Sequence, residues 1–224
     1  MHARLQRASR AAPVFVKICG IRSAGDAAMA VAAGADAIGF VFHRDSSRHV
    51  CADGAAAIAA TVRGIEQVGV FVDAEIDTIE SVAQAVGFGV VQLHGNESPE
   101  FCREVARRTG CRIIKAIRVR GRSDLDRIAQ FDVDHILLDG FDPTSRGGSG
   151  RSFDWSLLDL VVASRSGLII AGGLTPGNVA DALNHHRTAG VDVSSGVETG
   201  GRKDLDKITA FVGAVRRWEI LGCR

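Results

Sequence analysis

The stretch VFVKICG, residues Val14 to Gly20, decides how the rest of the chain is interpreted. It is short, apolar and rich in β-branched residues, which predicts a buried β-strand. The strand ends at Cys19, and a glycine follows at once. Most free cysteines are small buried hydrophobic residues, but a thiol at a flexible strand end is also well placed for chemistry. Cys19 is therefore a candidate functional residue with a structural alternative.

The same kind of strand recurs seven more times at fairly regular spacing. The further strands are expected at residues 37–42, 68–72, 90–94, 112–116, 135–138, 167–171 and 191–194. Segments with helical periodicity or helix caps separate them, such as Ser23 before Asp26 and Ser98 before Pro99. Leu125, Ile128 and Phe131 mark a further helix, and another is expected near residues 155–163. Alternating strands and helices require a parallel sheet with right-handed crossovers. Eight such units in a chain of this length predict a single-domain (β/α)8 TIM barrel.

A doubly wound open sheet is the alternative fold. It usually carries a GxGxxG nucleotide fingerprint after its first strand, and this chain has none there. The 224 residues, of which 46% are hydrophobic and 24% charged, are enough for one large core. Residues 1–12 are basic and do not resemble a secretory signal, so residues 1–13 are expected to form a tail before a barrel domain at 14–224.

Charge and cysteine content exclude several classes of partner. The formal net charge is +1, which gives no case for nucleic acid or an anionic membrane. No stretch approaches the roughly 20 apolar residues of a spanning helix. The five cysteines have no CxxC or Cys/His spacing, so we expect no metal site and a reduced, cytoplasmic protein.

The active site of a TIM barrel lies at the carboxyl ends of its strands. Cys19 closes the first strand, and Asp139 closes the sixth. Because side chains alternate along a strand, Gln92 and His94 share a face, and we expect both to point into the barrel mouth.

Lys17 lies on the same side of its strand as Cys19, hence inside the barrel. A buried ammonium group requires a partner. When the barrel closes, the eighth strand lies beside the first, so we expect Lys17 to pair with Asp192.

Two glycine-rich corners follow the last two strands. Gly172 and Gly173 come after the seventh strand, and Ser195 and Gly196 after the eighth. Backbone N–H groups at such corners bind anions, and the loops after strands seven and eight are the usual phosphate site of this fold. The alternative is that these glycines only make turns. A third glycine-rich segment, Gly147 to Gly150, is either a mobile lid or a plain surface loop.

Several motifs occur in one order along the chain. They are KICG at 17–20, GFVF at 39–42, SR at 47–48, QLHG at 92–95, LD at 138–139, GGSG at 147–150, FDW at 153–155, GGL at 172–174 and DVSSGVE at 192–198. From about Val14 to Val215 the chain resembles the phosphoribosylanthranilate isomerase family of tryptophan biosynthesis. It departs from that family at residues 200–204, GGRKD, where a proline–glycine pair usually precedes Lys-Asp.

The resemblance implies an internal Amadori rearrangement. N-(5-phosphoribosyl)anthranilate would become 1-(2-carboxyphenylamino)-1-deoxyribulose 5-phosphate without metal or cofactor. By the family's pattern Asp139 is the general acid, Cys19 is the general base, and Arg48 holds the anthranilate carboxylate. An acid and a base must coexist near neutral pH, so the pKa of the acid should be raised and that of the thiol lowered.

Two alternatives stay open on the sequence alone. One is the related phosphosugar isomerase of histidine biosynthesis, which is expected to use two aspartates where this chain has a cysteine and an aspartate. The other is a phosphate-binding barrel without catalytic activity. In every case the expected partner is a small phosphosugar, and the chain is expected to be a monomer or a homodimer.

Overall fold

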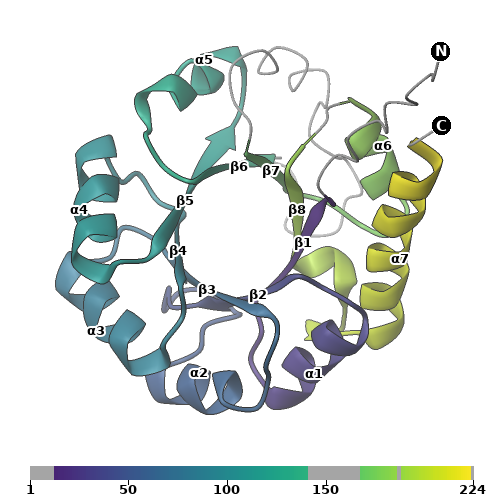
Figure 1. The fold of residues 1–224 in the computed structure, drawn as a ribbon, viewed down its shortest axis with the longest axis horizontal. Coiled ribbons are helices and arrows are strands. Elements are labelled where there is room, and N and C mark those ends of the chain that lie inside the picture. Colours follow the sequence, from purple (N-terminus) through teal and green to yellow (C-terminus); the bar gives the residue numbers. More distant parts are fainter. Residues whose placement is uncertain (1–12, 141–166, 186–187, 223–224) are drawn as a thin grey trace, which may run out of the picture.

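The computed structural model describes residues 13–140, 167–185 and 188–222. Within these residues eight parallel strands close into a barrel in the order of the sequence, and the helices surround it (Figure 1). The predicted (β/α)8 barrel is confirmed. The open doubly wound sheet is excluded, because β1 pairs with β8 and leaves the sheet without an edge.

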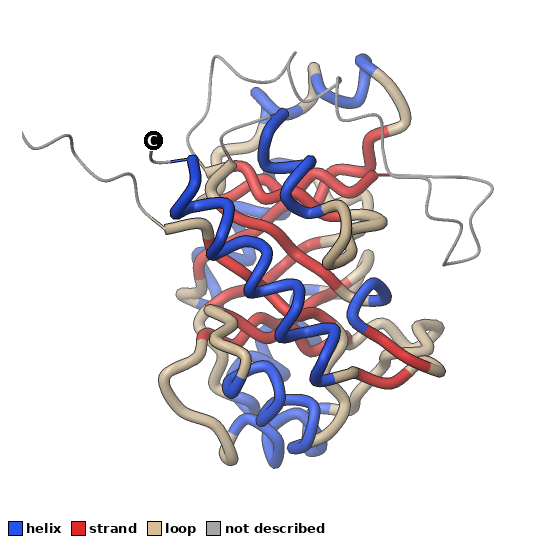
Figure 2. Tube along the Cα trace, turned by 90° about the vertical axis from the view of Figure 1, so that its right-hand side faces the viewer, coloured by secondary structure: helices blue, strands red, loops and turns tan. Residues whose placement is uncertain are grey.

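The eight barrel strands have the following bounds. They are β1 (Phe15–Cys19), β2 (Ala37–Val41), β3 (Glu66–Phe71), β4 (Val90–Leu93), β5 (Arg112–Val119), β6 (His135–Gly140), β7 (Leu168–Ala171) and β8 (Gly190–Val193). The α-helices of the described part are α1 (Ala24–Ala32), α2 (Ala52–Ala59), α3 (Ile76–Val86), α4 (Pro99–Thr109), α5 (Arg122–Leu125), α6 (Val179–His185) and α7 (Leu205–Gly222). In side view the strands form the interior and the helices the outer layer (Figure 2).

The helix starts that the sequence marks are formed as expected. Ser23 Oγ accepts a hydrogen bond from the Asp26 amide, 3.1 Å away, at the start of α1. Ser98 Oγ accepts from the Phe101 amide at 3.2 Å, and Pro99 occupies the first turn of α4. Each cap supplies an acceptor for an amide that has no partner within the helix.

Two segments differ from the sequence-based expectation, and two others lie outside the described residues. The helix expected around 125–131 is only the short α5 followed by the 3₁₀ turn η1 (Ile128–Gln130). Its buried residues Leu125, Ile128 and Phe131 are spaced by three, which suits 3₁₀ geometry as well as an α-helix. β5 extends to Val119, past the expected end at 116. The predicted loop at 147–150 and a helix expected near 155–163 lie outside the described residues.

A small hairpin, which the sequence analysis did not predict, follows β8. It consists of β9 (Glu198–Thr199) and β10 (Arg202–Lys203) and comes after the 3₁₀ turn η3 (Ser195–Val197). Gly200 and Gly201 form its turn with φ of +58° and +73°, a backbone region that glycine adopts without strain. The hairpin lies where the chain departs from the family's usual sequence.

The barrel has two hydrophobic cores, one inside the strands and one between the strands and the helices. The inner core contains Cys19 and Val70, whereas Val16 and Ile18 belong to the outer core. Alternate side chains of β1 therefore point in opposite directions. This alternation directs the last side chain of β1 toward the barrel interior.

Candidate active site

Cys19 lies at the carboxyl end of β1 and is buried, with 8% of its surface exposed. Gly39 of β2 is its register partner. A Cβ atom on Gly39 would lie 2.9 Å from the Cys19 sulfur and 3.2 Å from Lys17 Cε. The absence of a side chain at Gly39 therefore leaves the space that the thiol and the lysine occupy.

The thiol differs from the expectation in one respect, because the pKa of Cys19 is raised instead of lowered. Burial is the largest cause, since it disfavours the thiolate. The positive charges of Lys17 and Lys203 lower the pKa, but less than burial and the nearby Asp192 carboxylate raise it. The prediction of a lowered thiol pKa was wrong for the ligand-free protein, because it considered the cations without the desolvation.

The predicted pairing of Lys17 with Asp192 is confirmed. Lys17 Nζ lies 2.9 Å from Asp192 Oδ1, and both side chains are buried. Neither atom forms a hydrogen bond of ordinary geometry with any described residue, so attraction between charges holds the pair. Burial alone would lower the pKa of Lys17, but the charges of Asp192 and Cys19 raise it. The pair joins the two strands that close the barrel.

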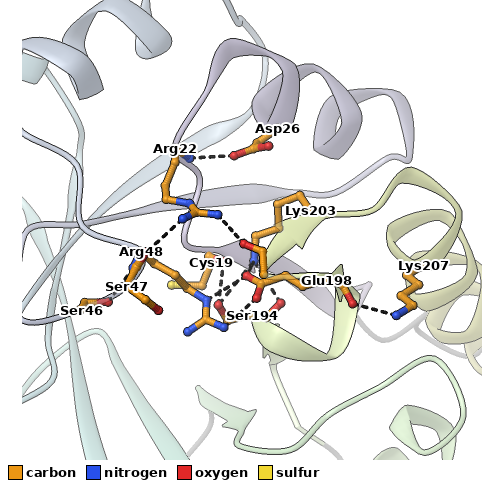
Figure 3. A network of polar contacts seen from close by, with 11 residues as sticks. Cys19, Arg22, Asp26, Ser46, Ser47, Arg48, Ser194, Glu198, Lys203 and Lys207 are labelled. Carbon is orange, nitrogen blue, oxygen red and sulfur yellow. Dashed lines mark hydrogen bonds and ion pairs between the residues drawn. The ribbon is translucent and has the colours of Figure 1, made fainter. Parts of the chain in front are cut away.

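Arg48, in the loop after β2, is held by a carboxylate from the far end of the chain (Figure 3). Its Nε donates to Glu198 Oε1 at 2.8 Å and its Nη2 donates to Glu198 Oε2 at 2.7 Å. This two-point geometry fixes the plane of the guanidinium group. Nη1 forms no hydrogen bond with the described residues, and 28% of the side chain is exposed. One edge of the guanidinium group is therefore left for a ligand.

Lys203 shares Glu198 with Arg48. Its Nζ donates to Glu198 Oε1 at 2.7 Å and to the Ser194 carbonyl at 3.0 Å. Ser194 Oγ in turn donates to the Cys19 carbonyl at 3.0 Å, so these side chains gather around the end of β1 (Figure 3). Burial lowers the pKa of Lys203, although the ion pair with Glu198 opposes this shift.

Asp139 is the first residue of a chain of hydrogen bonds along one wall of the mouth. Its Oδ2 lies 3.0 Å from His94 Nε2. His94 Nδ1 lies 2.8 Å from the amide nitrogen of Gln92. Gln92 is completely buried, whereas His94 and Asp139 are about three-quarters buried. The expectation that Gln92 and His94 point to the same side of their strand is confirmed by this contact.

The two glycine corners predicted to bind phosphate lie against each other. A Cβ atom on Gly196 would fall 1.8 Å from the Leu174 carbonyl oxygen, so the turn after β8 packs directly on the turn after β7. Asn178 secures the turn after β7, because its side chain accepts from the Thr175 amide and donates to the Gly173 carbonyl. The amides of Gly173, Ser195 and Gly196 form no hydrogen bond with another described residue. They are therefore available to an anion.

Sequence reasoning missed Glu198 and Lys203. Both are charged and both are almost fully buried at the barrel mouth. Glu198 ends the DVSSGVE motif, which was the available signal, but a single glutamate in a loop does not indicate its partner. The partner, Arg48, is 150 residues away in the sequence.

The described residues contain no group of three His, Cys, Asp or Glu side chains placed to hold a metal ion. In the same part of the chain no helix is long and apolar enough to cross a membrane.

Fold and site together define a class of protein: TIM-barrel enzymes that place a thiol, a carboxyl group and an arginine around one mouth. Among these the chain belongs to the N-(5'-phosphoribosyl)anthranilate isomerase family, whose sequence pattern matches residues 16–214. It is 44% identical over 201 residues to N-(5'-phosphoribosyl)anthranilate isomerase of Trichlorobacter lovleyi, which covers 89% of this chain and 96% of that protein.

Solved structures agree with the sequence relatives. Phosphoribosyl anthranilate isomerase from Thermotoga maritima superposes with a TM-score of 0.83 at 40% identity and covers 91% of this chain and 99% of that one. A phosphoribosyl anthranilate isomerase in complex with reduced 1-(o-carboxyphenylamino)-1-deoxyribulose 5-phosphate gives a TM-score of 0.78 at 39% identity, with 91% and 99% coverage.

Proposed function

We propose that Asp139 and Cys19 are the general acid and the general base of the phosphoribosylanthranilate isomerase reaction of tryptophan biosynthesis in this chain. The observation that carries the assignment is their position. Cys19 lies at the carboxyl end of β1 and Asp139 at the carboxyl end of β6, and in the closed barrel these two strand ends face the same mouth. The likeness to a family member solved with a reduced product analogue supports a phosphosugar as the ligand of this site.

The reaction needs two proton transfers on opposite sides of the ribose. Asp139 gives a proton to the ring oxygen, the bond from C1 to that oxygen breaks, and the anilino nitrogen forms an iminium ion with C1. Cys19, as thiolate, removes the C2 proton, and the electron pair flows toward the iminium nitrogen. The enolamine then takes a proton at C1 while its C2 hydroxyl becomes the ketone. The iminium ion is a built-in electron sink, so this route needs no cofactor.

The raised pKa of the free Cys19 thiol fits this sequence of events. A positive iminium ion beside the sulfur favours the thiolate, as any nearby cation does. Lys17 and Lys203 already act in that direction. The thiol would thus become deprotonated, and available as the base, when the C2 proton becomes acidic.

Arg48 and the glycine corners account for the two ends of the substrate. The unused edge of the Arg48 guanidinium group is suited to the planar anthranilate carboxylate. We assign the phosphate to the amides of Gly172, Gly173, Ser195 and Gly196, and the contact between the two corners supports a single phosphate site.

The assignment is tested by the loss of anthranilate fluorescence on turnover, with a histidine-pathway substrate as a control for specificity. We expect Cys19→Ala and Asp139→Asn each to lower kcat by roughly 100- to 10,000-fold, because each removes one proton transfer. Asp139→Asn should still bind product. The matched controls Cys51→Ala and Asp126→Asn change exposed residues of the same types and should keep wild-type turnover. Near-native activity of either site variant would disprove the role of that residue.

We further propose that the protein works in the cytoplasm as a monomer or homodimer. The cysteines among the described residues are free thiols, which supports a reducing compartment. We also propose that the domain begins at Val14. Its carbonyl accepts from Arg216 Nη1 at 2.7 Å and its amide donates to Glu219, which ties the first strand to α7.

A further inference from the structure

The side chains of Gln92, His94 and Asp139 form a directional chain of hydrogen bonds. A neutral imidazole has one N–H donor and one acceptor nitrogen, and the partner of one nitrogen sets the role of the other. The structure sets the amide nitrogen of Gln92, which is only a donor, 2.8 Å from His94 Nδ1, and in this orientation Nδ1 accepts from it. The proton of the ring then lies on Nε2, which donates to Asp139 Oδ2.

The backbone of His94 and the side chain of Gln92 are both held in place by the barrel. The His94 amide donates to the Phe71 carbonyl of β3 at 2.8 Å, which ties the end of β4 to its neighbour. Gln92 is held inside the barrel without exposure to solvent. The direction of the N–H bond toward Asp139 is therefore built into the barrel wall.

We propose that Gln92 and His94 are positioning residues that reserve Asp139 Oδ2 as an acceptor and confine the transferable proton to Oδ1. An acceptor role for Oδ2 suits the carboxylic acid, in which Oδ2 is the carbonyl oxygen, and it equally suits the carboxylate. The same hydrogen bond from His94 thus persists while Oδ1 gives its proton to the ring oxygen. The inference rests on the proposed role of Asp139 as general acid.

Gly172 shows where the second oxygen of Asp139 lies. A Cβ atom on Gly172 would come within 2.7 Å of Asp139 Oδ1 and within 2.4 Å of the Gly140 amide nitrogen. Oδ1 therefore faces the end of β7, beside the corner that we assign to the phosphate. The proton would be offered beside the phosphate site, and the ring oxygen is bonded to C4, the carbon that carries the phosphorylated C5.

A purely structural role does not explain Gln92. Its side-chain oxygen is buried and has no hydrogen-bond partner among the described residues. An unsatisfied buried oxygen destabilises a fold, and an apolar side chain of similar size would fill the same space without that penalty. The polar contact that Gln92 does make is the one from its amide nitrogen to His94.

The tautomer of His94 is measured directly by NMR of protein labelled with ¹⁵N-histidine. We expect the ligand-free wild type to show Nε2 protonated and Nδ1 unprotonated, with the signals of His94 identified by their absence in His94→Ala. In Gln92→Glu the new carboxylate accepts from Nδ1, so the ring proton should move to Nδ1 or the ring should become doubly protonated. The matched control Gln67→Leu removes a side-chain amide on β3 that donates to the Ala59 carbonyl of α2, and it should leave the His94 spectrum unchanged.

Kinetics provide the second measurement. Gln92→Leu should lower kcat by roughly 10- to 100-fold, as loss of a partner that orients a functional histidine does elsewhere, with little change in KM. His94→Gln, which can keep an N–H near the Nε2 position, should retain more activity than His94→Ala.

An Nδ1–H tautomer in the wild type would overturn the inference even if no Gln92 variant folds. So would a Gln92→Leu variant with native kcat. If Asp139→Asn is active, the proposed general acid itself fails. If Asp139→Asn is inactive but the His94 tautomer does not depend on Gln92, only the positioning role fails.

Discussion

Glu198 is the side chain that Arg48 and Lys203 share at the barrel mouth. It accepts two hydrogen bonds from Arg48 and one from Lys203, and its side chain is only 6% exposed. Burial alone would raise the pKa of this carboxyl group, but the bonds and charges of its two partners lower the pKa to about 2. Without Glu198 the guanidinium group would lose its fixed plane.

The lowered pKa of Glu198 predicts a stability that depends on pH. A carboxyl group whose folded pKa is below its ordinary value of 4.5 stabilises the fold above that value. This contribution is lost as the pH falls from about 5 toward 2, and it amounts to something on the order of 3 kcal/mol. In urea unfolding, the free energy of unfolding of Glu198→Gln should therefore be lower than that of the wild type, by a difference that is largest near neutral pH and shrinks in acid. The exposed Glu75→Gln is the control, and a gap independent of pH would contradict the prediction.

The turn between β1 and α1 depends on one glycine. Gly20 has φ of +81°, a region that residues with a side chain rarely adopt. A Cβ atom there would lie 2.5 Å from Arg48 Cδ and 3.2 Å from Ser194 Oγ. Gly20 therefore permits the turn and also lets Arg48 lie across the end of β1, next to Cys19.

We expect Gly20→Ala to affect both stability and substrate binding. The strained backbone should cost about 1–3 kcal/mol of folding free energy. The displaced Arg48 should raise KM more than it lowers kcat, because its proposed ligand, the anthranilate carboxylate, is a part of the substrate that does not react. Gly25→Ala is a matched control, since Gly25 lies in α1, where the nearest atom to an added Cβ is 3.6 Å away. Unchanged KM in Gly20→Ala would show that Arg48 does not depend on this turn.

The barrel as a whole closes where β1 meets β8, and a buried ion pair lies at that seam. Phe15 to Ile18 run alongside Gly190 to Val193, and this register sets Lys17 directly opposite Asp192. Each charge is tolerated in the barrel only because the other is present.

Removal of one partner should therefore damage the fold more than removal of both. Lys17→Ala should lower the free energy of unfolding by about 3–5 kcal/mol, because it leaves Asp192 buried and unpaired. The double variant Lys17→Met/Asp192→Leu should unfold at a higher urea concentration than Lys17→Ala, since it removes both charges and keeps the volume. An equal or lower midpoint for the double variant would show that pairing of the two charges is not the main contribution of these residues to stability.

Local patterns in the sequence were sufficient for the architecture and for part of the site. Eight strands, the caps at Ser23 and Ser98 and the inward direction of Lys17 depend on residues within a few positions of one another. The pairing of Lys17 with Asp192 was also predictable, because barrel closure sets β8 beside β1. Its place at a strand end indicated Asp139, the family resemblance supplied the role of Asp139 and that of Arg48, and family membership is now shown over residues 16–214.

The fold class followed from periodicity alone, since strand and helix patterns are written in neighbouring residues. The electrostatics of the mouth required the folded chain. Glu198 lies 150 residues from Arg48, and His94 lies 45 residues from Asp139, so no local pattern pairs them. The raised pKa of Cys19 has the same origin, because burial inside the closed barrel and the nearby Asp192 carboxylate of β8 raise it, and both depend on segments distant in sequence.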